Sequence, residues 1–229
     1  DAPPFQDYQF LNDTMHHLVI KPTLSCTANC PTCSLRRELH KQLRNRSHLS
    51  LEQWIEVLTE ARDVGAWHLT ISGGEPTLYP RLGELIRTAR EMGFLVRLNS
   101  NGSFADLGYA EELILSGLNI IDISLYSSTS HVHDRMRRCN GLWNKATRNI
   151  RHLAGLQKKY NRFTVISQTI LCRENYRDFA NLFRLLRTLG STGVLVSYLE
   201  GDFGGVHQPR TEEMEVFRQE ILPQTLLDC

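Results

Sequence analysis

Six short apolar segments, rich in Val, Ile and Leu, alternate along this chain with longer amphipathic stretches. Runs of this kind are typical of strands that are buried on both faces of a sheet. The predicted strands are residues 17–24, 67–72, 94–99, 120–125, 163–170 and 193–199. Because strands that alternate with helices pair in parallel through right-handed crossovers, the pattern predicts an α/β fold, either barrel-like or an open doubly wound sheet.

Capping and stop signals delimit the first helices between these strands. Ser50 and Gln53 form a capping box ahead of an apolar helix face, and Gly65 is predicted to stop that helix. Pro80 is predicted to lie in the first turn of the next helix, where its missing N–H does no harm. Gly93 is predicted to stop that second helix.

The second half of the chain has the same signals. Helices are predicted at residues 107–116 and 143–159, and Asn175 is predicted to cap the helix that follows it. A last helix is predicted at 211–227, where Pro223 should kink or end it because proline lacks the N–H that helix bonding needs.

Length and composition set the broad class. The 229 residues fit one domain, which we expect to span 1–229 with a β/α core at about 17–200. An apolar share of 41% is enough for a substantial core. The 26 Lys and Arg nearly balance the 25 Asp and Glu, for a net charge of +1, which argues against nucleic acid as a partner. Because the chain opens at Asp1 and closes at Cys229, we expect a piece of a longer protein.

The chain carries no sign of a membrane or secretory destination. No apolar run reaches the roughly 18 residues that span a bilayer, and no signal-peptide pattern opens the chain. Three of the six cysteines lie within eight residues, which suits metal ligation better than disulfides. We therefore expect a protein of the reducing cytoplasm that has no membrane partner.

Those three cysteines, Cys26, Cys30 and Cys33, directly follow the first predicted strand with the spacing C-x3-C-x2-C. Three thiolates can hold three irons of a four-iron cluster and leave the fourth iron open to an added ligand. A zinc site with a distant fourth ligand, or three unrelated core cysteines, would give the same spacing. Cys139 and Cys172 lie far away in the sequence and are predicted to be core residues.

This spacing resembles that of the radical S-adenosylmethionine (SAM) superfamily. The resemblance implies a 4Fe–4S cluster on the three cysteines, with an open iron that binds the amino and carboxylate groups of SAM. One electron from the cluster then cleaves SAM to methionine and a 5′-deoxyadenosyl radical, which abstracts hydrogen from a substrate. An electron donor such as flavodoxin or ferredoxin is implied as well. The family usually has an aromatic residue near the SAM adenine just before the third cysteine, where this chain has Thr32. The resemblance then implies a weaker adenine contact, made by the backbone of Thr32.

A second segment, Gly-Gly-Glu-Pro at 73–76, follows the second predicted strand. Two glycines let a backbone approach a ligand closely, and a carboxylate beside them can accept hydrogen bonds from an ammonium group. An ordinary strand-to-helix turn is the alternative. The segment resembles the family motif that cradles the SAM amino group, which implies that Gly73, Gly74 and Glu75 bind SAM.

Two further strand ends carry segments similar to those of the family. The residue types of Asn-Ser-Asn-Gly at 99–102 predict only a turn. The segment also resembles the family's Thr-Asn-Gly segment, which lies near SAM. Asn101 is therefore expected either to contact SAM or only to shape the turn. Asp-Ile-Ser-Leu at 122–125 resembles the family's Val-Ser-Leu-Asp segment, which implies a contact from Ser124 to SAM. Tyr126 replaces the usual Asp.

The resemblance also marks two later places. The charged stretch 131–138 matches a region where family members have a His-Asp pair and a following Arg, which implies that Arg135 or Arg137 reaches the SAM carboxylate. A solvated helix face is the alternative. Leu199, at the end of the sixth predicted strand, aligns with a position that lends backbone contacts to adenine, although an ordinary core leucine would look the same.

A basic segment at 36–46 bears on the substrate. It carries five cations (Arg36, Arg37, Lys41, Arg44 and Arg46) against one anion. A solvated surface is one explanation for this run, and attraction of an anionic small molecule such as a phosphate or a nucleotide is the other.

All the motifs follow strands, and barrel active sites form at the carboxyl ends of strands. We therefore predict a partial (β/α)6 TIM-like barrel with radical SAM chemistry in a biosynthetic pathway. The predicted substrate is a small metabolite such as a sugar or nucleotide-linked sugar, and no residue is assigned as the catalytic group. A peptide-modifying radical SAM enzyme is one alternative, and a non-enzymatic, zinc-stabilised α/β binding module is the other.

Overall fold

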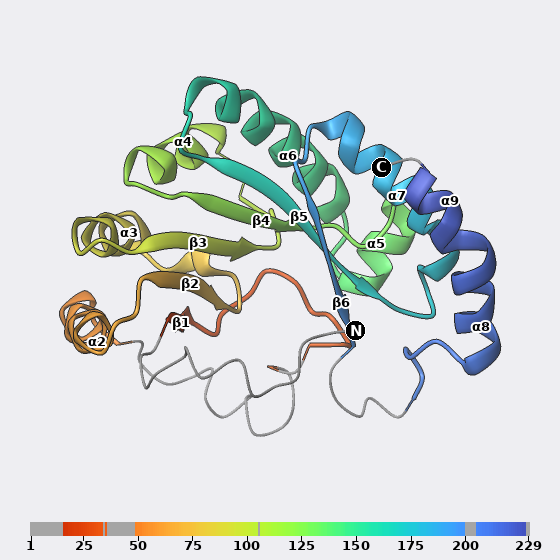
Figure 1. Cartoon of the computed structure of the whole chain (residues 1–229), viewed down its shortest axis with the longest axis horizontal. Coiled ribbons are helices and arrows are strands. Elements are labelled where there is room, and N and C mark those ends of the chain that lie inside the picture. Colours follow the sequence, from red (N-terminus) through yellow and green to blue (C-terminus); the bar gives the residue numbers. More distant parts are fainter. Residues whose placement is uncertain (1–15, 34, 36–48, 105, 200–204, 228–229) are drawn as a thin grey trace, which may run out of the picture.

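The computed structural model describes residues 16–33, 35, 49–104, 106–199 and 205–227. Six parallel strands form one sheet, in which each strand pairs with the next along the chain (Figure 1). The strands are β1 (His17–Thr23), β2 (His68–Gly73), β3 (Leu95–Ser100), β4 (Ile120–Ser124), β5 (Thr164–Leu171) and β6 (Val194–Tyr198). Every predicted strand is present, with its ends within one residue of the prediction.

The helices lie mainly on the outer, convex side of this curved sheet (Figure 1). They are α2 (Leu51–Asp63), α3 (Leu82–Glu91), α4 (Leu107–Leu115), α5 (Ser130–Arg137), α6 (Leu142–Lys159), α7 (Phe179–Leu189), α8 (Thr211–Val216) and α9 (Leu222–Leu227). Short 3-10 turns occupy Pro76–Leu78 and Tyr176–Asp178, and a π-helical turn occupies Phe217–Ile221. None of the described helices is long and apolar enough to cross a membrane.

The main core fills the layer between the sheet and its outer helices. Leu85 and Ile86 of α3 and Val96 and Leu98 of β3 are all fully buried there. Burial of each such side chain stabilises the fold by about 1.5–3 kcal/mol. Alternate residues of β3 face the opposite, concave side, where Asn99 lines a cavity.

The predicted capping box is confirmed, because the Ser50 side chain and backbone exchange hydrogen bonds with Gln53. The prediction for Pro80 is wrong, since α3 begins at Leu82 and Pro80 lies in the turn before it. The prediction for Asn175 is also wrong, because its side chain makes no cap. Instead it accepts from the Cys172 N–H and donates to the carbonyl oxygens of Tyr126, after β4, and of Ile170, in β5.

The sixth helical region departs from the repeating pattern. Instead of covering β6, α9 packs against α7, and Phe217 joins Phe179 with ring centroids 5.3 Å apart. Both faces of β6 therefore stay partly exposed. Pro223 does not end the predicted helix but is the second residue of α9, which follows the π-helical turn. A π-helical turn shifts the pattern of backbone hydrogen bonds in a helix, and a proline has no N–H to donate to that pattern.

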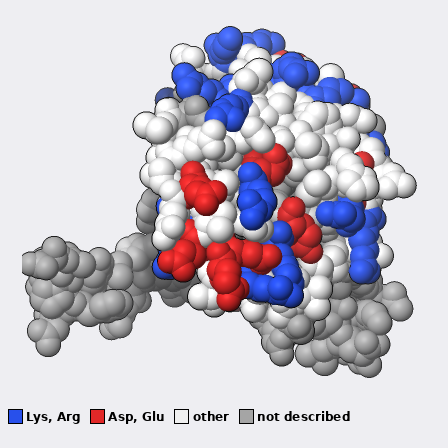
Figure 2. Space-filling view, turned by 90° about the vertical axis from the view of Figure 1, so that its right-hand side faces the viewer, with Lys and Arg blue, Asp and Glu red and all other residues white. Residues whose placement is uncertain are grey.

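The face formed by the last helices carries mixed charge. Figure 2 shows acidic and basic side chains lying beside one another on this face. One such pair joins Arg173 and Glu213, with Nε and Oε1 3.1 Å apart. Charges of opposite sign at this spacing largely cancel at a distance. Toward the top of the same view the charged side chains are mostly basic.

Candidate active site

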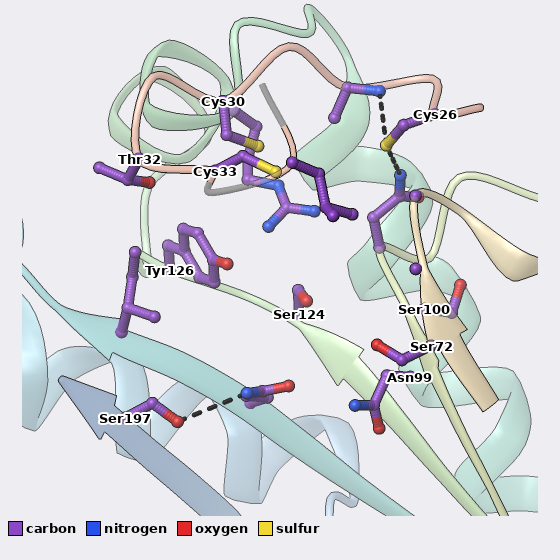
Figure 3. Close-up of a pocket in the computed structure, with 18 of the residues that line it drawn as sticks. Cys26, Cys30, Thr32, Cys33, Ser72, Asn99, Ser100, Ser124, Tyr126 and Ser197 are labelled. Atoms are coloured by element: carbon purple, nitrogen blue, oxygen red, sulfur yellow. Dashed lines mark hydrogen bonds between the residues drawn. The ribbon is translucent and has the colours of Figure 1, made fainter. Parts of the chain in front are cut away.

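A cavity of about 380 Å³ opens at the carboxyl ends of the strands, below the loop that follows β1 (Figure 3). Each of the six strands contributes at least one polar side chain to its wall. These residues include Lys21, Ser72, Asn99, Ser124, Gln168 and Ser197, and β3 adds Ser100. Because the strands are parallel, their carboxyl ends meet at one edge of the sheet, where α/β active sites form.

The loop after β1 places Cys26, Cys30 and Cys33 on the cavity wall, with their sulfurs above the strand ends (Figure 3). The Cys33 N–H donates to the Cys30 carbonyl at 3.3 Å, and the Asn29 N–H ties the loop to the carbonyl of Arg137 at 2.9 Å. Among the described residues, no three His, Cys, Asp or Glu side chains converge to hold a single metal ion. A four-iron cluster instead takes one thiolate for each ligated iron.

The Cys26 sulfur has two hydrogen-bond donors. The Ala28 N–H lies 3.4 Å from it and the Asn101 amide nitrogen 3.6 Å (Figure 3). Burial raises the pKa of the Cys26 and Cys30 thiols, whereas the nearby positive charge of Arg137 acts in the opposite direction. Donors and a cation of this kind favour the thiolate form, which is the form that binds metal.

The Gly-Gly-Glu-Pro segment is tied to the cysteine loop through its backbone. The Gly74 N–H donates to Thr23 O at 2.9 Å, and the Glu75 N–H donates to Ser25 O at 2.7 Å. A Cβ atom on Gly74 would lie 2.1 Å from Ser25 O, and Gly73 has a φ of +119° that other residues rarely adopt. Both glycines line the cavity, so their backbone faces the space where a ligand would lie.

Glu75 itself lies behind the cavity wall with its side chain fully buried. Its carboxylate accepts hydrogen bonds from Ser100 Oγ at 2.8 Å, from the Asn101 N–H at 2.7 Å and from both the N–H and the hydroxyl of Thr77. The structure thus differs from the prediction that this carboxylate faces the SAM ammonium group. Glu75 instead joins the turn after β2 to the turn after β3.

Asn101 lines the cavity, yet its side-chain polar atoms all bind protein groups. Its Nδ2 donates to Thr27 Oγ1 at 3.0 Å as well as to Cys26, and its Oδ1 accepts from the Ser103 N–H at 2.8 Å. The side chain is therefore fixed in place beside the cysteine loop.

The remaining predicted residues divide into two groups. Thr32, Ser124 and Leu199 line the cavity. Arg135 is exposed and lies outside the cavity wall, so the structure does not place it at the site. The neighbouring Asp134 accepts from two backbone N–H groups at the start of α6 and therefore serves the fold.

Arg137, two residues further on, is the arginine that faces the cavity. Its side chain is buried, with its Cζ 4.6 Å from the centroid of the Tyr126 ring. Its Nε has no hydrogen-bond partner among the described residues. Although burial opposes its charge, nearby acidic groups, Tyr126 and Cys30 foremost, hold the pKa of Arg137 above its usual value. A buried cation with a free donor at a cavity is suited to an anionic ligand.

Asp122, the first residue of the Asp-Ile-Ser-Leu segment, also serves the fold. Its carboxylate binds Arg97 of β3 through two hydrogen bonds, of 2.5 and 2.7 Å. Burial raises the pKa of Asp122, and its bonds to Arg97 counteract that rise.

Several wall residues were not predicted, including Lys21, Asn99, Gln168 and Ser197. A signal for them exists in the sequence, because each is a polar residue near the end of an otherwise apolar strand. A polar side chain on a strand either faces solvent, pairs with another polar group as Asp122 does, or lines a site. The parallel topology brings those at the carboxyl ends of the strands to one edge.

The family was tested by comparison with known proteins. The model of the radical SAM superfamily matches residues 20–186, which is well over half of the chain. The chain belongs to the radical SAM superfamily. It is therefore an enzyme of a family that uses a 4Fe–4S cluster and SAM, and the alternative of a non-enzymatic zinc module is set aside.

The known proteins that this chain resembles include one named for a peptide substrate and two that have been solved with a bound peptide. The PqqA peptide cyclase of Streptomyces rochei is 35% identical over 108 residues, which are 47% of this chain and 29% of the relative. SuiB of Streptococcus suis bound to SAM is 16% identical with a TM-score of 0.76, over 94% of this chain and 48% of SuiB. The anSMEcpe structure with SAM and a Kp18Cys peptide is 16% identical with a TM-score of 0.69, over 88% of this chain and 57% of that one.

The likeness to the solved structures confirms the predicted partial barrel. The chain spans about half or less of the length of most of these relatives. The site residues also fit the family's cofactors. The cavity wall has three thiols, and the sulfur of one of them, Cys26, has two hydrogen-bond donors. The wall also has the backbone of two glycines and a buried cation with a free N–H.

Proposed function

We propose that this radical SAM chain is the catalytic core of an enzyme that modifies a peptide. The likeness to the PqqA peptide cyclase supports this proposal most, because it is a sequence likeness of 35% and the relative's name states a peptide substrate. SuiB has also been solved with its precursor peptide SuiA, although at 18% identity this likeness speaks for the fold alone.

The cavity wall suits such a substrate. Ser72, Asn99, Gln168 and Ser197 offer neutral amide and hydroxyl groups, and the Asn99 Oδ1 has no hydrogen-bond partner among the described residues. Peptide groups present both N–H donors and carbonyl acceptors, which amides and hydroxyls can match. Among the described strands, β1 and β6 form the two edges of the sheet and do not pair with each other, so the barrel is open on one side.

The sugar or nucleotide-linked sugar predicted first rested on the basic segment 36–46. That segment lies outside the described residues. The comparisons with known proteins favour a peptide, and we therefore do not carry the small-metabolite prediction forward.

Within the proposal, Cys26, Cys30 and Cys33 hold the cluster. When bound, the cluster and SAM supply a 5′-deoxyadenosyl radical that abstracts hydrogen from the substrate. The backbone at Gly73 and Gly74 would bind the SAM amino group. An electron donor such as flavodoxin or ferredoxin remains part of the proposal.

The other cofactor contacts follow from the same wall. Arg137 would bind the SAM carboxylate in place of Arg135, because it is a cation already desolvated at the cavity. Ser124 lies on the floor of the same space, and Thr32 and Leu199 are assigned to the adenine. These residues bind and orient SAM so that its reacting carbon lies near the substrate and away from water.

Label transfer tests the substrate class directly. The reconstituted enzyme would be supplied with SAM and a reductant, together with either a pool of short peptides deuterated at carbon or a matched panel of deuterated sugar phosphates and nucleotides. We expect mass spectrometry to find deuterium in 5′-deoxyadenosine with the peptide pool. Transfer from the sugar or nucleotide panel alone would overturn the proposal.

A further inference from the structure

Asn101 makes a contact that the binding of SAM does not require. Its side-chain amide donates to the sulfur of Cys26, the first of the three cysteines, across 75 residues of sequence. The amide is buried, and only 2% of the Asn101 surface is exposed. A buried donor directed at a metal-binding sulfur is a means by which a protein sets the properties of an iron–sulfur cluster.

The orientation of this amide is fixed on both sides. The Ser103 N–H donates to Oδ1 at 2.8 Å, so the oxygen must face Ser103 and the NH2 group must face the cysteine loop. Of its two N–H bonds, one reaches Thr27 Oγ1 at 3.0 Å, which leaves the other for Cys26 Sγ at 3.6 Å.

The backbone of Asn101 is held just as firmly. Its N–H donates to the buried carboxylate of Glu75 at 2.7 Å, and Ser100 Oγ, beside it, donates to the same carboxylate at 2.8 Å. The N–H of Glu75 in turn donates to Ser25 O, one residue before Cys26. Glu75 is thus hydrogen-bonded to Asn101 on one side and to the cysteine loop on the other, and it holds the two at a fixed distance.

We propose that Asn101 is a positioning residue that raises the reduction potential of the cluster by donating a hydrogen bond to the Cys26 sulfur, and that Glu75 holds it in place. Reduction adds negative charge that spreads onto the sulfurs, and a donor stabilises that charge more in the reduced than in the oxidised state. The inference rests on the proposed assignment of Cys26 as a cluster ligand.

The test compares two variants, one of which removes the hydrogen bond from Asn101 to Cys26 while the other removes only the hydrogen bond from Asn101 to Thr27. Asn101→Leu keeps a side chain of similar size but loses the donor to sulfur. Thr27→Val removes the hydroxyl that Asn101 also binds, and it leaves the amide free to donate to Cys26. A role limited to fixing the loop would make the two variants behave alike.

The measurements are iron and sulfide content and the midpoint potential of the reconstituted protein, by redox titration without SAM or substrate. We expect Asn101→Leu to keep its iron and to lower the equilibrium constant for reduction about tenfold, which is a shift of about 59 mV to more negative potential. Thr27→Val should keep the potential of the unaltered protein.

An unchanged potential in Asn101→Leu at full iron content would overturn the inference, and so would equal shifts in both variants. If Asn101→Leu takes up no cluster, the smaller change Asn101→Ala is titrated instead, and the same two outcomes decide. Iron loss in Cys26→Ala tests the ligand assignment separately, so a failure of the assignment and a failure of this inference are distinguishable.

Discussion

The guanidinium of Arg137 lies over the ring of Tyr126, with its Cζ 4.6 Å from the ring centroid, on the wall shared with the three cysteines. The ring supports a buried cation whose Nε has no hydrogen-bond partner among the described residues. This arrangement leaves the charge of Arg137 available to an anionic ligand in the cavity.

Arg137→Met should weaken SAM binding to the reconstituted enzyme by about 1.5–3 kcal/mol, the range for hydrogen bonds to charged groups. Met conserves much of the volume, so the fold should tolerate the change. Arg135→Met is the matched control, because Arg135 is exposed two residues away. Calorimetric titration with SAM would measure both, and equal affinities in the two variants would contradict the assignment of the SAM carboxylate to Arg137.

Glu75→Gln should lower the free energy of unfolding by about 1–3 kcal/mol, because an amide NH2 would then face groups that are themselves donors. The buried carboxylate now accepts from Ser100, Asn101 and Thr77. Denaturant unfolding would measure the loss. Glu84→Gln is the control, and it should change stability much less because Glu84 is exposed and water replaces its contact with Arg81. Equal losses would show that the Glu75 contacts are not special.

The strands could be read from the sequence, whereas the role of Glu75 could not. Short apolar, β-branched runs reveal strands directly, so both ends of all six strands lay within one residue of the prediction. The partners of Glu75, Ser100 and Asn101, are 25 and 26 residues away. Only the pairing of β2 with β3 brings these residues together, and local sequence carries no sign of such a contact.

Which of Arg135 and Arg137 faces the cavity could have been predicted from the sequence in part. Two residues along a helix differ in direction by about 200°, so only one of the pair can face the cavity. His133, four residues before Arg137, is also buried. A helix at Ser130–Arg137, had it been predicted, would have placed these two on one face and Arg135 on the other.

Gly74→Ala should disrupt the site, because the added Cβ would lie 2.1 Å from the backbone oxygen of Ser25 in the cysteine loop. We expect a fall in iron uptake on reconstitution together with lower thermal stability. Gly155→Ala in α6 is the control, since its Cβ would meet nothing within 4 Å and alanine favours a helix by up to about 1 kcal/mol. Normal iron uptake in Gly74→Ala would show that the loop moves aside freely.

His133 should make stability depend on pH. Its side chain is fully buried, Nδ1 accepts from the Tyr126 N–H, and burial together with the charge of Arg137 lowers its pKa to about 3. Between that value and about 6.5 the unfolded chain binds a proton that the native state does not, so stability falls as the pH drops.

The variant His133→Gln keeps an acceptor for the Tyr126 N–H but does not titrate. From pH 7 to pH 5 the unaltered protein should lose about 2 kcal/mol of stability relative to this variant, at about 1.4 kcal/mol per pH unit below 6.5. Denaturant midpoints at each pH would measure the difference. Parallel stability curves for the two proteins would contradict the lowered pKa, because they would mean that His133 binds its proton equally well in the native and unfolded states.

The ligand assignment can be tested most directly by iron analysis of single cysteine variants after anaerobic reconstitution. Cys26→Ala, Cys30→Ala and Cys33→Ala would be compared with Cys139→Ala, which packs beside the same loop but is not a proposed ligand. We predict that each of the first three loses the 4Fe–4S absorption and the SAM cleavage, while Cys139→Ala retains about four irons per chain and its activity. Full iron content and unchanged SAM cleavage in Cys30→Ala would contradict the assignment of the cluster to these three cysteines.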